Sequence, residues 1–144
     1  MSPEPDIDPR DLYPLSEKAP HLVRSQTGLT LADFTVDAVL EGRIGAADLA
    51  ITPEALRLQA DVARAVGRDR LAENFERAAE LVAVPQEMLL DTYELLRPGR
   101  AKSANELRER AGLMRRDYGA TRIAALIEEA ADVCERRGLF TKRF

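Results

Sequence analysis

The chain contains a single histidine, His21, and a single cysteine, Cys134, the side chains from which nucleophilic or metal chemistry would most readily start. With one imidazole, two-histidine metal sites, Ser-His-Asp triads and Cys-His dyads are excluded or severely restricted. His21 follows Pro20 in a proline-rich segment, which favours a surface or packing role. Cys134 falls on the apolar stripe of the last predicted helix, where we expect a buried, inert thiol.

Two acidic residues near the C-terminus have the spacing of a shared proton or cation site. Glu128 and Asp132 are four residues apart and would project from one helix face. No histidine or further inward carboxylate accompanies them, so we interpret them as part of a solvated charged face. Gly42 and Gly45 form no phosphate loop, because no G-x-x-x-x-G-K sequence follows a strand.

A cluster of arginines precedes that region and could bind phosphate. It consists of Arg108, Arg110, Arg115 and Arg116. Glu106, Glu109 and Asp117 interleave with it, which is typical of a mixed-sign helix face rather than an anion site. The sequence therefore provides no catalytic, cofactor-binding or metal-binding constellation.

The overall composition bounds the classes of protein that fit. The chain has 144 residues and a formal net charge of -4, so no global positive field favours nucleic acid. No apolar run approaches the length of a membrane span, and no secretory signal is evident. A single cysteine excludes an internal disulfide framework and fits a reducing cytoplasm, where we expect the protein to be found.

The stretch from Ile51 to Pro85 is the best-defined structural element. Thr52 as N-cap and Pro53 at the first helical position start a helix, and Gly67 ends it. A second helix follows and ends near Pro85. Its apolar seam, which we expect to be buried, is formed by Leu71, Phe75, Ala78, Ala79 and Val82. The opposite face is predicted to carry Glu73, Glu76 and Glu80.

One flank of this second helix is neither plain core nor plain surface. It is formed by Arg70, Asn74, Arg77 and Leu81. Arginine suits an interface, because its planar donor fork pairs bidentately with carboxylates or carbonyls. The alternative is an intrachain pair, with Glu73 and Arg77 at i, i+4 as the candidate.

The first helix is apolar over most of its circumference. Its narrow polar stripe is Glu54, Arg57, Asp61, Arg64 and Arg68, and its apolar arc includes Leu58 and Val62. One neighbouring helix cannot cover such an arc, so the sequence predicts a binding partner for it.

Residues 1–34 contain five of the eight prolines: Pro3, Pro5, Pro9, Pro14 and Pro20. We predict an extended arm, with about the first 12 residues disordered. From Leu12 onward, apolar anchors such as Tyr13 follow no helical period, which suits an arm lying across another surface. An arm folded back on its own helices is the alternative.

The remainder predicts a mostly α fold with about five main helices. Short helices are expected over 35–41 and 44–49, a third long helix after Pro85, and a fourth after a capping box at Ser103 and Glu106. The last helix carries Ile123 and Ile127. Residues 35–138 form the predicted helical domain, and 139–144 a basic tail.

Several of these stretches resemble one known family in the same order. They are YPL at 13–15, LADFT at 31–35, AVL at 38–40, ITPEALRLQA from 51, GRDRLAENFERAAELVAVP from 67 and LRPGR from 96. The chain resembles the small (gamma) subunit of adenosylcobalamin-dependent diol and glycerol dehydratases over roughly residues 13–137. The GRDRLAENFERAAEL block is more similar to the diol branch.

The resemblance implies a radical hydro-lyase in which this chain is non-catalytic. The enzyme converts 1,2-propanediol to propionaldehyde, or glycerol to 3-hydroxypropionaldehyde, plus water. A large barrel subunit holds the active site, adenosylcobalamin lies between large and medium subunits, and two copies of each subunit assemble. Ala19, Pro20 and His21 do not make the D-x-H-x-x-G motif of a cobalt-ligating histidine.

We therefore expect this chain to clamp the large subunit. The predicted interface residues are Tyr13, Leu58, Val62, Arg70, Asn74, Arg77 and Leu81. Only twelve mostly polar residues precede Tyr13, so we expect no helix for packaging into a microcompartment; another subunit would have to supply it. The alternative function is a stand-alone helical adaptor with an inherited fold.

Overall fold

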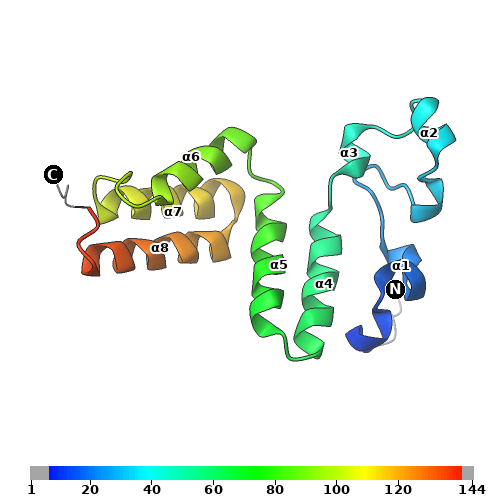
Figure 1. Cartoon of the computed structure of the whole chain (residues 1–144), viewed down its shortest axis with the longest axis horizontal. Coiled ribbons are helices and arrows are strands. Elements are labelled where there is room, and N and C mark those ends of the chain that lie inside the picture. The colour runs from blue at the N-terminus through cyan, green and yellow to red at the C-terminus, as the bar shows by residue number, and fades with distance from the viewer. Residues whose placement is uncertain (1–6, 141–144) are drawn as a thin grey trace. The chain divides into compact units, whose positions relative to one another are not determined.

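The computed structural model describes residues 7–140 and is built from helices (Figure 1). The longer helices are α4 (Pro53–Ala65), α5 (Asp69–Leu81), α6 (Gln86–Leu96), α7 (Ala104–Tyr118) and α8 (Thr121–Arg136). The shorter ones are α1 (Leu15–Lys18), α2 (Val36–Leu40), α3 (Ala46–Leu49) and the 3-10 turns η1 (Pro9–Leu12), η2 (Pro20–Leu22) and η3 (Leu31–Asp33). The predicted mostly α fold with five main helices is confirmed.

Contacts within the chain define two compact units, Met1–Val82 and Ala83–Phe144. The first contains everything from η1 to α5, and the second contains α6, α7 and α8. The segment predicted as a separate arm therefore belongs to the same unit as α4 and α5.

The α4–α5 hairpin is fixed by the capping residues that the sequence predicts. Thr52 Oγ1 accepts a hydrogen bond from the Ala55 N–H at 3.2 Å, and Pro53 occupies the first turn. Gly67 adopts a φ of 76°, a left-handed conformation that residues with a Cβ rarely take. The two helices then run side by side in opposite directions, as the green ribbons of Figure 1 show.

The buried face of α5 differs from the predicted seam. Ala72 is fully buried and Ala79 nearly so, whereas Leu71 is 40% exposed. Ala60, Ala63 and Ala72 form a buried cluster, and Phe75 packs against it. Small side chains let the two backbones approach closely, and this contact turns Leu71 outward. The prediction that Leu71 is buried is therefore wrong.

The N-terminal segment is also different from its prediction. Within the described residues, 7–34 are not simply extended: η1, α1, η2 and η3 follow one another, joined by extended residues such as Tyr13 and Val23. Pro9 and Pro20 sit in the first turns of η1 and η2, where a missing N–H costs nothing. The expected disorder is wrong for Pro9–Leu12, while residues 1–6 lie outside the described residues.

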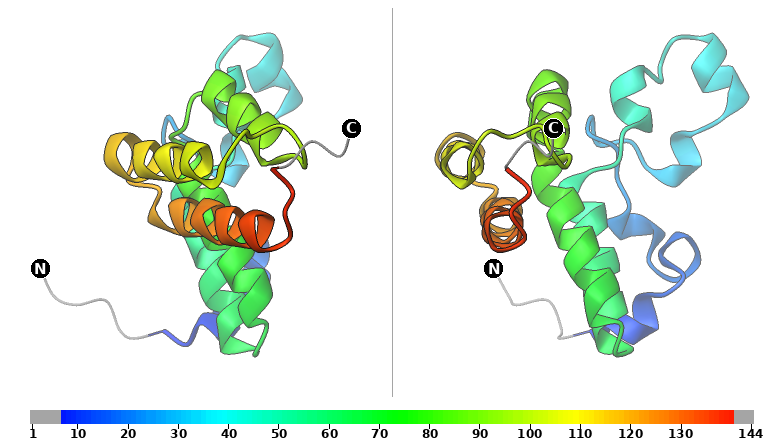
Figure 2. Two further views of the ribbon diagram at one scale, coloured as in Figure 1. Left: turned by 90° about the vertical axis from the view of Figure 1, so that its left-hand side faces the viewer. Right: turned by 60° about the vertical axis from the view of Figure 1, so that its left-hand side comes forward.

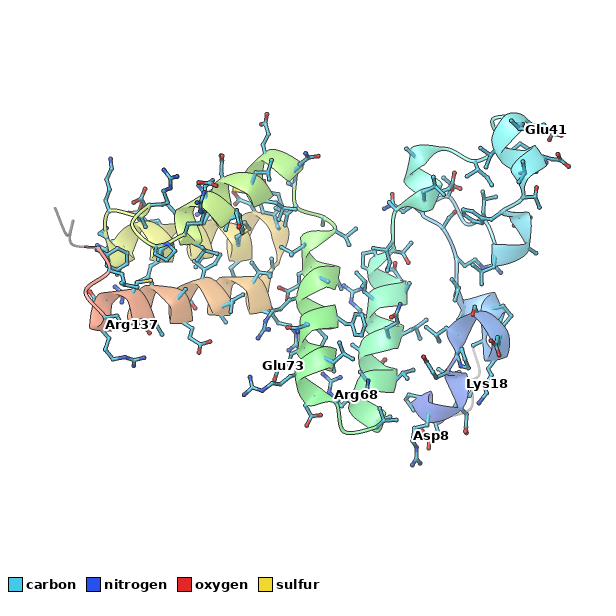
Figure 3. The ribbon with its side chains drawn as sticks, in the orientation of Figure 1. Asp8, Lys18, Glu41, Arg68, Glu73 and Arg137 are labelled. Carbon is cyan, nitrogen blue, oxygen red and sulfur yellow. The ribbon has the colours of Figure 1, made fainter. Side chains whose placement is uncertain are left out.

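Part of this segment packs on the chain's own helices. The turn η1 contacts α4. Asp8, the N-cap residue of η1, is labelled in Figure 3. In the structure, η1 therefore folds back on a helix of its own chain, which is the alternative to an arm lying across another surface. The wide apolar arc of α4 thus has two covers from its own chain, α5 and η1.

A buried carboxylate ties a loop to α3. Asp48 accepts hydrogen bonds from the hydroxyls of Thr27 and Ser25, the latter at 2.8 Å, and from the Gly45 N–H at 3.0 Å. The loop is closed by an isolated antiparallel bridge between Arg24 and Thr30. These hydrogen bonds, that of Thr27 foremost, lower the pKa of the Asp48 carboxyl.

In the second unit, α7 and α8 form an antiparallel pair, seen end-on and side-on in Figure 2. The largest fully buried side chains among the described residues are Leu107, Met114 and Ile127. Gly119 ends α7 with a φ of 63°, and the Ala120 N–H reaches back to the Met114 carbonyl at 3.1 Å. The predicted apolar residues of the last helix, Ile123 and Ile127, are both buried, so that prediction is confirmed.

Candidate subunit interface

The predicted interface stripe of α5 faces away from α4. Asn74 is nearly opposite Ala72 on the helix, so the face that carries Asn74 is not the one that packs on α4. Arg70 and Asn74 are exposed, and Arg77 and Leu81 are half-buried. The structure therefore leaves this stripe on the outer face of the hairpin.

Arg77 has neighbours on its own helix. Its Nη1 donates to Asn74 Oδ1 at 3.0 Å, and its Nη2 lies 3.7 Å from Glu73 Oε2. Glu73 is labelled on α5 in Figure 3. The intrachain alternative is thus present, but a long and partly exposed pair of this kind contributes little. A guanidinium has five N–H donors, so these contacts leave Arg77 able to bind a further acceptor.

Leu58 and Val62 are half-buried rather than exposed. Both lie on the side of α4 away from Leu56 and Ala60, which are buried. Tyr13 is 64% exposed, so its ring offers most of its surface to solvent. Leu58, Val62 and Tyr13 therefore do not form one continuous surface with the α5 stripe of Arg70, Asn74, Arg77 and Leu81.

Glu76, which the sequence places on the solvent face of α5, instead forms an ion pair with Arg64 of α4. Arg64 Nη2 lies 2.7 Å from Glu76 Oε1, and the Glu76 side chain is only 16% exposed. The placement of Glu76 on the solvent face is therefore wrong. The helical turn of α5 that buries Ala72 also brings Glu76 towards α4, a consequence that the composition of the seam alone does not predict.

The surface of α4 beside η1 is hollowed. An open depression of about 260 Å³ is lined by Pro9, Asp61, Arg64 and Ala65. Arg64 is bound to Glu76 and also lies 3.7 Å from Asp61, so the positive charge in this depression already has carboxylate partners.

Two arginines of the α7 cluster, Arg108 and Arg115, bind acidic residues of α8, as expected of a mixed-sign face. Arg115 donates to both carboxylate oxygens of Glu128 at 2.9 and 3.0 Å. Arg108 bridges Asp132 at 2.8 Å and Glu135 at 3.0 Å. The hydrogen bonds from Arg115 lower the pKa of the Glu128 carboxyl. Glu128 and Asp132 are therefore partners of arginines rather than of each other.

One polar contact that sequence inspection missed joins α6 to α7. The buried Thr92 hydroxyl donates to the Met88 carbonyl at 2.7 Å and accepts from Arg110 Nη1 at 2.8 Å. A threonine on a predicted amphipathic helix gave no signal of this role, because its partner is 18 residues away.

The remaining candidates for chemistry belong to different units of the chain. His21 is exposed in η2, and Cys134 is half-buried on α8 rather than fully buried as expected. Across residues 7–140, no three side chains of His, Cys, Asp or Glu gather closely enough to hold a metal ion. Over the same residues, every helix is too short or too polar to cross a membrane.

Comparison with known proteins matches nearly the whole chain to one family. A family model described as "Dehydratase small subunit" matches residues 9–141. The propanediol dehydratase small subunit of Citrobacter freundii is 50% identical over 119 residues, which are 83% of this chain and 69% of that protein. The propanediol dehydratase small subunit of Salmonella typhimurium is 47% identical over 131 residues, or 91% of this chain and 72% of that one. The chain therefore belongs to the dehydratase small-subunit family.

Proposed function

We propose that this protein is the non-catalytic small subunit of an adenosylcobalamin-dependent diol dehydratase. The complex would convert 1,2-propanediol to propionaldehyde and water, with glycerol as a second substrate. The observation that carries the proposal is identity of about one half, over more than four-fifths of the chain, to two propanediol dehydratase small subunits.

The physical role that remains for a subunit without catalytic residues is to stabilise others. In the proposed complex this chain clamps the large subunit, in an assembly with two copies each of the large, medium and small subunits. The outward stripe of Arg70, Asn74, Arg77 and Leu81 supports this role, because these side chains are exposed or half-buried on the face of α5 that does not pack on α4. Tyr13 adds an exposed aromatic ring, the side-chain type that interfaces favour.

The cofactor does not fit the residues of this chain. The only histidine, His21, is exposed and lacks the motif of a cobalt ligand, and the open depression beside η1 has its arginine engaged by Glu76. We therefore assign adenosylcobalamin to the large and medium subunits, where it would supply the radical that starts the dehydration.

The experiment is co-expression of the large and medium subunits with and without this chain, followed by an assay of aldehyde formation from 1,2-propanediol in the presence of adenosylcobalamin. We expect co-purification of all three chains and activity that depends on this one. Full activity without it, together with no co-purification, would instead support a stand-alone adaptor. The same assay with glycerol tests the second substrate.

A further inference from the structure

Helix α2 exposes its large apolar side chains and buries a small one. Its buried residue is Ala38, which is fully covered, while Val36, Val39 and Leu40 are 75%, 54% and 79% exposed. Their spacing of three and four residues places these large side chains on one face of the helix. This apolar face, defined by Val36, Val39 and Leu40, points away from the unit that carries it.

The helix is held in shape by its ends rather than by this face. Thr35 Oγ1 accepts a hydrogen bond from the Ala38 N–H at 3.1 Å, and the Arg43 N–H donates to the Ala38 carbonyl at 2.9 Å. Gly42 takes a φ of 73° at the C-terminal end. A helix of five residues is too short to persist by propensity. Its caps therefore present the apolar face in a fixed geometry, which lowers the entropy cost of docking.

The rim of the apolar face is acidic. Asp33, Asp37 and Glu41 lie just before, within and just after α2, and Glu41 is labelled at the end of the helix in Figure 3. Arg43 is the only cation in residues 31–51, and its Nε lies 2.7 Å from Glu41. Arg24, from outside this range, acts with Arg43 on the carboxylate of Asp33, so the three acidic groups exceed these two arginines by one charge. A complementary surface would therefore be an apolar groove with basic residues along its edges.

We infer that α2 docks through this apolar face into a basic-rimmed apolar groove of the large dehydratase subunit. The inference rests on the proposed function, because a small subunit needs a partner, and it adds a contact site that the α5 stripe does not include. The mode is that of a helix in a groove, anchored by residues at i, i+3 and i+4. Leu49 and Ile51, also exposed, extend the apolar surface beyond α3.

The test compares two double variants in the co-expressed complex. V36Q/L40Q keeps helix-forming side chains but makes the face polar, whereas V36I/L40M keeps it apolar. We expect V36Q/L40Q to reduce capture of this chain by a tagged large subunit at least about tenfold, since central apolar anchors carry most of the affinity. V36I/L40M should be captured like the wild type. Circular dichroism of each full chain reports whether its helices remain.

The outcomes separate the two proposals. Failure of the wild-type chain to co-purify with the large subunit would refute the proposed function itself. Equal capture of V36Q/L40Q and wild type would refute only the docking of α2. Loss of helical signal in V36Q/L40Q, with V36I/L40M intact, would mean that the apolar face of α2 is covered within this chain. Capture of this chain by the medium subunit alone would place the groove on the medium subunit. Both results overturn the inference.

A charge variant tests the basic rim. Asp37→Lys should weaken capture at about 0.05 M salt and much less at about 0.5 M, because salt screens exposed charges. A loss that does not change with salt would overturn the assignment of basic residues to the rim.

Discussion

In the proposed complex, Arg77 is the residue whose role depends most on a partner subunit. Its side chain is 31% exposed and contacts Asn74 and Glu73 on the same helix. Arg77→Glu should weaken association with the large subunit about tenfold, a typical effect for an interface arginine. The measurement is retention of this chain on the tagged large subunit.

A charge swap separates the partner role from the intrachain pair. In the double variant E73R/R77E the pair within α5 is restored with reversed polarity, while any partner carboxylate meets the wrong charge. We expect this variant to bind as weakly as Arg77→Glu alone. Recovery of binding in the swap would show that Arg77 matters only within its helix.

Asp48 makes a second residue-scale prediction, because its hydrogen bonds lower the pKa of its carboxyl. Asp48→Asn keeps one acceptor oxygen in place of two, so the contacts with Ser25, Thr27 and Gly45 cannot all be kept. We expect a fall in Tm of several degrees at pH 7, measured by thermal denaturation followed by circular dichroism.

The pH dependence has a definite sign. A carboxyl whose pKa is lower in the folded state stabilises that state above the unfolded pKa of about 3.9, and this contribution is lost as the pH falls through the folded pKa. The difference in Tm between wild type and Asp48→Asn should therefore shrink as the pH drops below about 4. A difference that is constant with pH would contradict the role of the ionised form.

At the scale of elements, the α7–α8 pair is held mainly by apolar packing. Met114 is fully buried between these helices, whereas Leu126 on α8 is 38% exposed. Met114→Ala should lower the free energy of unfolding by about 2–5 kcal/mol, because it removes buried atoms and leaves a cavity. Urea titration followed by circular dichroism measures this loss.

Leu126→Ala is the matched control, since it truncates a partly exposed side chain of the same helix pair. Its effect should be about 1 kcal/mol or less. Equal losses for the two variants would mean that Leu126 is covered as fully as Met114, and that the packing described for the unit is incomplete.

For the whole molecule, the proposed assembly predicts a fixed stoichiometry. The purified complex should contain the large, medium and small subunits in equal numbers, two of each. Native mass spectrometry of the co-expressed complex measures this directly. A species that lacks this chain but keeps full activity and both other subunits would contradict the clamping role.

Cofactor binding is a separate property of the whole assembly. Equilibrium dialysis of this chain alone against adenosylcobalamin should show no retention above background, whereas the three-chain complex should retain the cofactor. Retention by the isolated chain would overturn the assignment of the cofactor to the other subunits.

The sequence by itself determined the five long helices and the family. Helix boundaries follow from local hydrogen bonds and backbone preferences, so Thr52 and Gly67 were sufficient to place the two ends of α4. The family was readable because its stretches occur in one order along the chain. None of these inferences depends on contacts between distant residues.

The tertiary structure decided which faces are buried. Close approach of α4 and α5 through Ala60 and Ala72 turned Leu71 outward and Glu76 inward, although both helices were predicted in place. Likewise the spacing of Val36 and Leu40 predicts one apolar face of α2, but spacing is the same whether that face is inside or outside. Burial is set by contacts between segments far apart in the chain, and for that reason only the folded molecule shows it.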